Sequence, residues 1–217
     1  MIAGVSVEAG REAVVLVSER PLRVLSSAVH QGGFVDARAV VNLHVGNNDP
    51  CADPAGMIAA YARRVGVPGP WVGLLTGART ERAAMAEEAI AHLSALAVTT
   101  VGLSNPVAAG HSPIAAWAPS TINTVVVVDA DPEPAALVNA IITATEVKGL
   151  ALRAAGLVVE SGVAASGTST DAVVIAVTGR GAAERFGGPA SPLGWVVARA
   201  VRAALDRSIR DWQERHR

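Results

Sequence analysis

Several common signatures are missing from the 217 residues. Cysteine occurs once, at Cys51, which excludes a disulfide framework and a zinc site built from cysteines. Aromatic residues make up 3% of the chain, so the core has to be built from Val, Leu, Ile and Ala. The sequence has no Gly-x-Ser-x-Gly elbow, no Walker loop, no Gly-x-Gly-x-x-Gly after a strand and no His-x-x-x-His pair. The usual short motifs of serine hydrolases, nucleotide-binding folds and helical zinc sites are therefore absent.

The charge balance and the apolar runs argue against further classes. The formal net charge is −1, with no basic patch outside the C-terminus, so nucleic acid is not an expected partner. No apolar run reaches the length of a membrane span, and the N-terminus lacks the basic and apolar regions of a signal sequence. We therefore expect a cytoplasmic protein without a membrane partner. The scattered histidines form no pair at metal-ligand spacing, so no metal is expected.

The sequence does contain an alternation of strand and helix patterns. Short β-branched runs predict strands at 13–18, 23–29, 39–45, 71–76, 97–103, 121–128 and 173–177. Helices are predicted at 53–65, 80–94, 131–155 and from residue 192 onward.

This alternation predicts an α/β fold with one domain over residues 1–217. We expect a mixed β-sheet core flanked by helices, in which the strands 23–29 and 39–45 form an antiparallel hairpin. The order strand, Asp-Pro, helix, strand occurs twice, which leaves open two pseudo-equivalent βαβ halves.

Small polar clusters interrupt the apolar pattern between residues 120 and 178. They lie at 120–124 before a four-valine strand, at 143–149 in a helix, and at 165–172 before the last strand. An unpaired buried hydroxyl, amide or carboxylate costs on the order of 1–3 kcal/mol. Such clusters in core elements therefore indicate a polar network or a site.

One of these clusters holds Lys148, the only lysine beside seventeen arginines. A lysine amine, unlike a guanidinium, can lose a proton and act as a compact donor, so Lys148 is a candidate catalytic group. Glu146 is a candidate general base if it is buried, although residues i and i+2 of one helix point apart unless the helix is distorted. With Asn139 and Thr143, Glu146 also has the spacing of one polar stripe. The simpler alternative places this stripe and Lys148 on a solvated helix face.

Two loops are further candidates. The run 166–170 combines glycine with hydroxyls, and its backbone N–H groups can form an oxyanion hole with Asp171 fixing the turn. An ordinary Ser/Thr/Gly turn is the alternative. The loop 108–119, which holds His111 and Trp117, is either a binding loop or a plain surface connection.

Six motifs occur together in the order and spacing of one known family. They are Leu25-Ser-Ser-Ala28 with Gln31-Gly-Gly33, Gly102-Leu-Ser-Asn-Pro106, Thr121-Ile-Asn-Thr124, Thr143-Ala-Thr-Glu-Val-Lys148, Ala165-Ser-Gly-Thr-Ser-Thr-Asp-Ala172 and Gly188-Pro-Ala-Ser-Pro-Leu-Gly194. Over residues 25–205 the sequence thereby resembles the adenosylcobinamide amidohydrolase family, CbiZ.

The resemblance implies an enzyme of corrinoid salvage. It would hydrolyse the amide between aminopropanol and the corrin side chain of adenosylcobinamide, releasing adenosylcobyric acid and 1-aminopropan-2-ol. The corrinoid is then the substrate and small-molecule partner, no cofactor is implied, and a homo-oligomer stays open.

The chemistry of the residues in these motifs suggests their roles. Catalytic roles are expected for Ser27, Glu146, Lys148, Thr170 and Asp171. Substrate-binding roles are expected for Ser26, Asn42, Asn105, Thr121, Asn123, Thr143, Gly167, Thr168 and Ser169.

Three alternatives to this enzyme stay open. The protein can bind a corrinoid without turnover, or it can hydrolyse another amide on the same scaffold. It can also be an autoprocessing hydrolase, in which chain cleavage exposes Thr168 or Thr170 as a new N-terminal nucleophile.

Overall fold

The computed structural model describes residues 2–46, 51–114 and 120–217. In these ranges, eight strands form one mixed sheet in the order β4-β3-β2-β11-β8-β6-β5, with β1 added to β2. The strands of this sheet are β1 (Val5–Ala9), β2 (Ala13–Ser26), β3 (Gly33–His44), β4 (Trp71–Thr76), β5 (Ala84–Ile90), β6 (Leu93–Val101), β8 (Ile122–Asp129) and β11 (Ala172–Val177). Two short pairs are separate from it: β7 (Pro106–Val107) with β10 (Gly167–Thr168), and β9 (Asp131–Pro132) with β12 (Ala183–Glu184). The helices are α1 (Pro54–Val65), α2 (Pro134–Ala154) and α3 (Pro192–Arg215), with a 3₁₀ turn, η1, at Thr80–Arg82.

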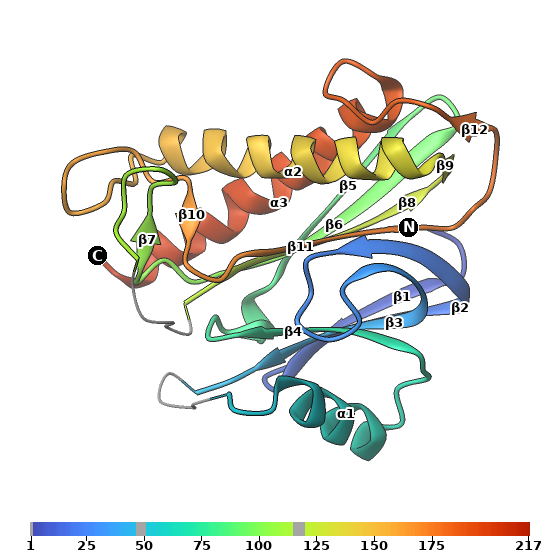
Figure 1. The fold of residues 1–217 in the computed structure, drawn as a ribbon, viewed down its shortest axis with the longest axis horizontal. Coiled ribbons are helices and arrows are strands. Elements are labelled where there is room, and N and C mark those ends of the chain that lie inside the picture. The colour runs from blue at the N-terminus through green and yellow to red at the C-terminus, as the bar shows by residue number, and fades with distance from the viewer. Residues whose placement is uncertain (1, 47–50, 115–119) are drawn as a thin grey trace.

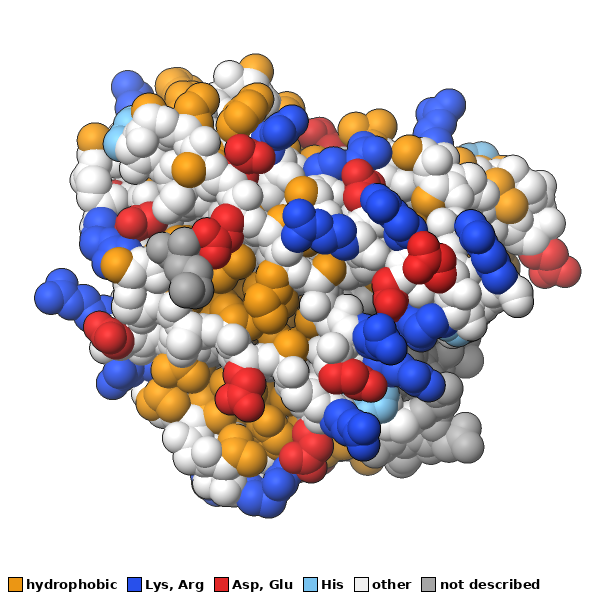
Figure 2. All heavy atoms as spheres, turned by 180° about the vertical axis from the view of Figure 1, so that it is seen from behind, with side chains coloured by type: hydrophobic (Ala, Val, Ile, Leu, Met, Phe, Trp, Pro, Cys, Tyr) orange, Lys and Arg blue, Asp and Glu red, His pale blue; other side chains and the backbone are white. Residues whose placement is uncertain are grey.

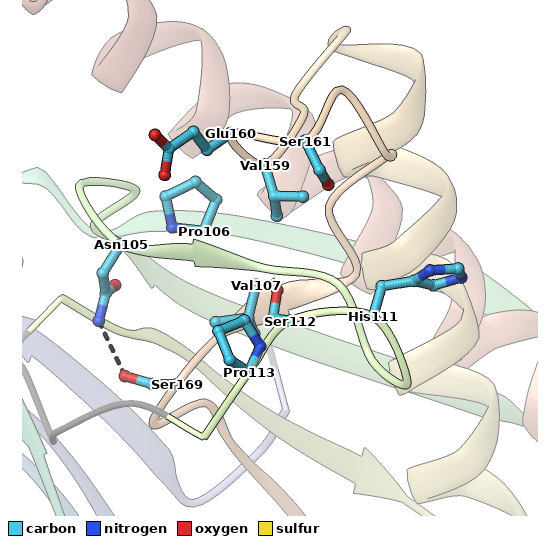
Figure 3. Close-up of a pocket in the computed structure, with 10 residues that line it drawn as sticks. All are labelled: Asn105, Pro106, Val107, His111, Ser112, Pro113, Val159, Glu160, Ser161 and Ser169. Atoms are coloured by element: carbon cyan, nitrogen blue, oxygen red, sulfur yellow. Dashed lines mark hydrogen bonds between the residues drawn. The ribbon is translucent and has the colours of Figure 1, made fainter.

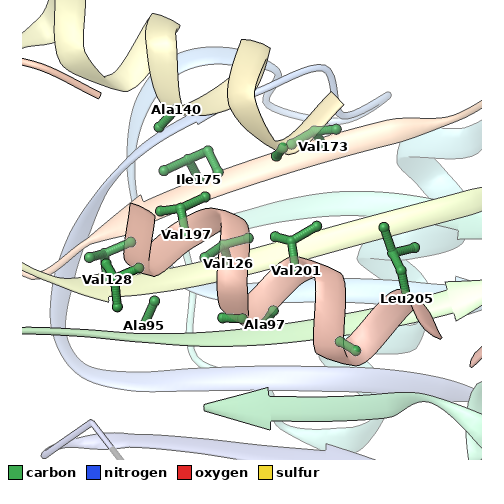
Figure 4. Packing of buried hydrophobic residues seen from close by; sticks show 14 of the residues in the cluster. Ala95, Ala97, Val126, Val128, Ala140, Val173, Ile175, Val197, Val201 and Leu205 are labelled. Carbon is green, nitrogen blue, oxygen red and sulfur yellow. The ribbon is translucent and has the colours of Figure 1, made fainter. Parts of the chain in front are cut away.

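The sheet folds over on itself, so that its two halves pack face to face. One buried cluster joins residues of β2, β3 and β4 to residues of β6, β8 and β11, and forms the inner core between the halves. A second cluster lies between β6, β8, β11 and the helices α2 and α3 (Figure 4). A third lies between the outer face of β2–β4 and α1. The result is four layers. The two halves of the sheet form the inner layers, α2 and α3 form one outer layer, and α1 forms the other (Figure 1).

Strand β2 connects the two halves because it belongs to both. Its first half pairs with β1 and β3, whereas its last residues pair with β3 and β11. The register shifts between Val17 and Leu22, around Pro21, which has no backbone N–H to donate to a ladder. Ala13 accordingly packs in the α1 layer, and Leu25 packs against the core under α2 and α3.

Helices α1 and α3 begin where their capping residues predict. The Asp53 carboxylate accepts a hydrogen bond from the N–H of Gly56, and the Ser191 hydroxyl accepts one from the N–H of Gly194. Each cap is followed by a proline at the first position of the helix. Helix α3 buries one apolar stripe that includes Leu193, Val197, Val201, Leu205 and Ile209.

Helix α2 is apolar on more of its surface. By length and composition alone it could cross a membrane, with a mean hydropathy of 1.4, so the expectation that no apolar run is long enough is wrong for this helix. This is weak evidence for a span, because a core helix passes the same test. In the structure α2 packs against α3 and β11 through Ala140, Ala144 and Ala151.

Most predicted elements are confirmed, including the mixed sheet, the β2–β3 hairpin and the helices at 54–65 and 192–215. Two βαβ units are present, since β3–α1–β4 and β8–α2–β11 each join neighbouring parallel strands. The helix predicted at 80–94 is wrong. Residues 84–90 instead form strand β5, which pairs antiparallel with β6, so tertiary pairing overrides the local helix propensity of this Ala- and Glu-rich run.

The inner core reaches the surface on the face opposite to the view of Figure 1. Apolar side chains gather there in a hollow (Figure 2). A cavity of about 200 Å³ lies between the edge strands β1 and β5 and is lined by Val5, Val7, Met85 and Leu96 among others.

The far end of β8 makes a testable contribution to stability. Asp129 accepts hydrogen bonds from Arg180 Nε and Thr178 Oγ1, each at 2.7 Å, and the Arg180 bond is the main reason that the pKa of Asp129 is lowered. A carboxyl with a lowered pKa in the folded state stabilises the fold above its unfolded pKa and loses this effect as the pH falls. We expect Asp129→Asn to lower the free energy of unfolding at pH 7, with the difference from wild type shrinking below about pH 4 in urea titrations. A difference that stays constant down to pH 2 would contradict this account.

Candidate active site

The polar clusters predicted from the sequence meet at one end of the central strands β8 and β11. Strands β8 and β11 are parallel neighbours, so the residues just before them, Thr121 and Asp171, lie at the same end. Lys148 reaches this end from the buried face of α2, and the short β10 strand lies beside it.

A buried ion pair between Lys148 and Asp171 forms the centre of the site. Only 11% of the lysine side chain and 8% of the aspartate side chain remain exposed. The Asp171 carboxylate also accepts the backbone N–H groups of Thr168 and Ile122, each at 3.0 Å, and the Thr168 hydroxyl at 2.5 Å. Asp171 therefore fixes the turn 168–171 to β8 and to α2, and its oxygens are fully engaged. The alternative that Lys148 lies on a solvated helix face is wrong.

Gly167 is required next to this ion pair. A Cβ atom at this position would lie 2.3 Å from Asp171 Oδ2 and 2.8 Å from Lys148 Nζ. No real Cβ tolerates such contacts, so any larger residue has to displace the charged pair. Gly167 therefore shapes the site and has no side chain with which to bind a substrate.

A pair of hydroxyls joins the turn to the residue just before β8. Thr121 Oγ1 and Thr170 Oγ1 are 2.5 Å apart, and Thr170 also lies within 3.4 Å of the Ser120 carbonyl oxygen. Thr121 is buried, whereas Thr170 is partly exposed. Ser169, between the two anchored threonines, is exposed and accepts a hydrogen bond from Asn105 Nδ2 at 2.8 Å.

A hydrogen-bonded chain of two asparagines and a threonine lies in the inner core, next to the hydroxyl pair. Asn123 Nδ2 donates to Asn42 Oδ1 at 2.8 Å and to the Leu75 carbonyl at 2.9 Å, and Asn42 Nδ2 donates to Thr100 Oγ1 at 2.9 Å. Asn42 and Asn123 retain 3% and 1% of their exposed surface, so they support the site from behind. Among the described residues, Asn123 Oδ1 has no hydrogen-bond partner.

The two serines at the end of β2 differ in position. Ser27 is exposed, and its hydroxyl accepts the N–H of Val173 at 3.0 Å while its own N–H donates to the Val173 carbonyl. It thus extends the β2–β11 ladder beside the turn. Ser26 is buried, and its hydroxyl is 3.4 Å from the N–H of Ala28.

Three sequence-based expectations about α2 need correction. Thr143 is 1% exposed and donates to the Gly187 carbonyl at 3.0 Å, so it anchors the 179–191 connection and is not available to a substrate. Glu146 is exposed, so the burial required for its role as general base is absent. Asn139 and Glu146 face solvent while Thr143 is buried, so the three residues do not form one stripe.

A pocket of about 480 Å³ lies beside the turn (Figure 3). Ser169 and Asn105 line one part of it, and the predicted binding loop contributes His111. Val107 and Val159 form an apolar part of the pocket wall. Trp117 of the same loop lies outside the described residues.

Sequence reasoning missed Glu160 and Ser161 of the pocket and Thr100 of the hydrogen-bonded chain. Glu160 and Ser161 follow α2 in a mostly apolar connection that carries no spacing signal. The role of Thr100 depends on the packing of the two halves of the sheet, which brings its hydroxyl to Asn42. No group of three His, Cys, Asp or Glu side chains with metal-binding geometry occurs in the part of the chain that the structure describes.

Residues 2–217 match the family described as adenosylcobinamide amidohydrolase, CbiZ. The chain belongs to the CbiZ family. The motif resemblance, which covers residues 25–205, is therefore confirmed and extends over nearly the whole chain.

One relative in sequence and two solved structures are similar to this chain. An adenosylcobinamide amidohydrolase from Methanosarcina mazei is 35% identical over 145 residues, which cover 67% of this CbiZ chain and 64% of that relative. Among solved structures, the PH0078 protein from Pyrococcus horikoshii OT3 has the same general fold, with a TM-score of 0.52 and 12% identity over 96% of this chain and 79% of that one. A Burkholderia sp. β-aminopeptidase reaches a TM-score of 0.48 at 13% identity, covering 91% of this chain and 78% of that one.

The packing at Gly167 gives a direct test of the ion pair. We expect Gly167→Ala to lower the free energy of unfolding by about 1–3 kcal/mol, because the new methyl group has to displace Lys148 or Asp171. Gly149→Ala is the matched control: no atom lies within 4 Å of a Cβ there, and alanine favours a helix by about 0.5–1 kcal/mol. Equal stability of the two variants in chemical denaturation would contradict the crowding.

The exposure of Glu146 predicts that it is dispensable. We expect Glu146→Gln to keep its fold and its rate within about threefold of wild type, because the side chain faces away from the turn. Loss of a true general base typically lowers the rate by about 10²–10⁴. A loss of that size in a steady-state assay would restore the original assignment.

Proposed function

We propose that this chain hydrolyses the aminopropanol amide of adenosylcobinamide, giving adenosylcobyric acid and 1-aminopropan-2-ol, in corrinoid salvage. Membership of the CbiZ family and the relative from Methanosarcina mazei support this activity. The observation that carries it is the turn 168–171, which sets partly exposed hydroxyls beside a buried ion pair at the rim of a large pocket. These are the groups that an amide hydrolase needs to polarise a carbonyl and stabilise charge.

The backbone of the turn suits the carbonyl oxygen of the amide. The N–H of Thr168 is held by Asp171, whereas the N–H groups of Ser169 and Thr170 have no acceptor among the described residues. Two such groups in a fixed turn can receive the negative charge that develops on the carbonyl oxygen. Lys148 lies behind the same turn, and its ion pair with Asp171 stabilises the arrangement.

Thr170 is the candidate nucleophile. The residue is partly exposed, lies in the same turn as the proposed oxyanion donors, and its hydroxyl shares a short hydrogen bond with Thr121. Attack by its oxygen on the amide carbon would break the carbon–nitrogen bond, with a proton going to the leaving amine. Water would then release the acid and return the proton to the hydroxyl, so that one water is consumed overall.

Recognition of the corrin is expected to rest on shape and amide pairing. Aromatic residues are 3% of the chain, which leaves little surface for stacking. Asn105 is partly buried at the pocket rim and carries both a donor and an acceptor, which matches the peripheral amides of a corrinoid. The proposal includes no cofactor and no metal, a cytoplasmic location, and no nucleic-acid or membrane partner.

The decisive experiment is a product assay with substitutions at Thr170. Wild-type protein incubated with adenosylcobinamide should give adenosylcobyric acid by mass spectrometry. Thr170→Ala should lower kcat/KM by about 10²-fold or more, because it removes the attacking oxygen, whereas Thr170→Ser should retain a large part of the rate.

Four outcomes would decide between this account and its alternatives. Binding of adenosylcobinamide without product would make the protein a corrinoid-binding protein. A fully active Thr170→Ala variant would move the chemistry to Ser27, Ser169 or a bound water. An active preparation of intact 22.0 kDa chains would eliminate autoprocessing at Thr168 or Thr170, and activity lost on chelation and restored by zinc or manganese would show that a metal is needed.

A further inference from the structure

The pocket beside the turn has an acidic character. It is lined by Asn105, Pro106, Val107, His111, Ser112, Pro113, Val159, Glu160, Ser161 and Ser169. This set contains one carboxylate and neither lysine nor arginine. Glu160 takes part in no ion pair with any residue that the structure describes, so its negative charge is available to a ligand.

The main chain holds Glu160 in a defined place. The N–H of Val159 donates to the Val163 carbonyl at 2.9 Å, and the N–H of Gly162 donates to the Val159 carbonyl at 2.8 Å. Gly162 has φ of 82°, which glycine adopts without strain, so residues 159–163 form a closed turn that carries Glu160. In Figure 3 Glu160 lies on one side of Pro106 and Ser169 on the other.

Ser169 connects this pocket to the reacting groups. It lines the pocket and lies in the same turn as Thr170, so an amide bound at the turn extends one of its two sides into the pocket. The acid side of the amide is a corrin ring, which is too large for a cavity of about 480 Å³. The amine side is 1-aminopropan-2-ol, which fits with room to spare.

We propose that this pocket receives the leaving amine and that Glu160 selects leaving groups that are neutral or cationic over those that carry a phosphate. This inference rests on the proposed hydrolysis of adenosylcobinamide. The released amine takes up a proton in water, and a nearby carboxylate attracts the ammonium that forms. The same carboxylate repels a phosphate on the terminal hydroxyl of aminopropanol.

Because the pocket has spare volume, we expect it to select leaving groups by their charge and not by their size. A phosphate would fit in a pocket of this size, so a change of charge alone should admit it. Two unit charges 4 Å apart in water interact by an energy equivalent to about a fivefold change in binding, and added salt weakens this effect.

The test compares adenosylcobinamide with adenosylcobinamide phosphate. We expect wild type to have the higher kcat/KM for the unphosphorylated substrate. Glu160→Gln should raise the relative kcat/KM for the phosphate by about fivefold, and Glu160→Lys should raise it further. The gain should shrink when the ionic strength is raised. Glu214→Gln, which removes an exposed carboxylate near the end of α3, is the control and should leave the preference unchanged.

Each result decides the proposal. An unchanged preference in both Glu160 variants, or an equal loss on both substrates, would overturn the amine subsite while leaving the hydrolysis intact. Absence of adenosylcobyric acid from the wild-type reaction would overturn the proposed function and this inference together. A preference that shifts with Glu160 and with salt supports the subsite, because a purely structural role does not depend on the charge of the leaving group.

Discussion

The buried ion pair of Lys148 and Asp171 is the constraint around which the site is arranged. A charge removed from water is stable only when a partner and hydrogen bonds compensate it, and Asp171 has the ammonium, two backbone N–H groups and a hydroxyl. These donors come from α2, from the start of β8 and from the turn before β11. Satisfying one carboxylate therefore brings three segments distant in sequence to one point. The space beside Gly167 is crowded. This explains why position 148 holds a lysine, whose ammonium is compact, in a chain that otherwise uses arginine.

The two cores of the protein meet at this point. On one side of the β8–β11 pair is the apolar core under α2 and α3, and on the other is the inner core between the halves of the sheet. At the end of the inner core that lies nearest the site, Asn123, Asn42 and Thr100 are joined by hydrogen bonds. These bonds satisfy buried polar groups that would otherwise need water. The hydroxyls of Thr121 and Thr170 thus lie next to this buried network, while the exposed Ser169 and the pocket beside it face solvent.

The sequence predicted those parts of the site that depend on composition or on local turn chemistry. Lys148 was recognisable because it is the only lysine, and Asp171 because Asp after a Ser/Thr/Gly run fixes turns. Glu146 was misassigned because two residues along a helix correspond to a rotation of about 200°, so Lys148 facing the core places Glu146 in solvent. Strand β5 was missed because its pairing with β6 is a tertiary effect, and the roles of Thr100 and Asn42 depend on the folding over of the sheet. Glu160 has no neighbours in sequence that distinguish it from any acidic loop residue.

The position of β11 has a consequence for the order in which the chain assembles. This strand comes late in the sequence but lies in the middle of the sheet, between β2 and β8. Until residues 172–177 are in place, β2 and β8 each expose an unpaired edge, and the partners Ser26 and Val174 are separated by most of the chain. Such long-range closure is slow compared with the formation of local βαβ units. During synthesis the β8–α2–β11 unit, which contains the Lys148–Asp171 ion pair, can therefore form before β11 pairs with β2 and joins the two halves of the sheet.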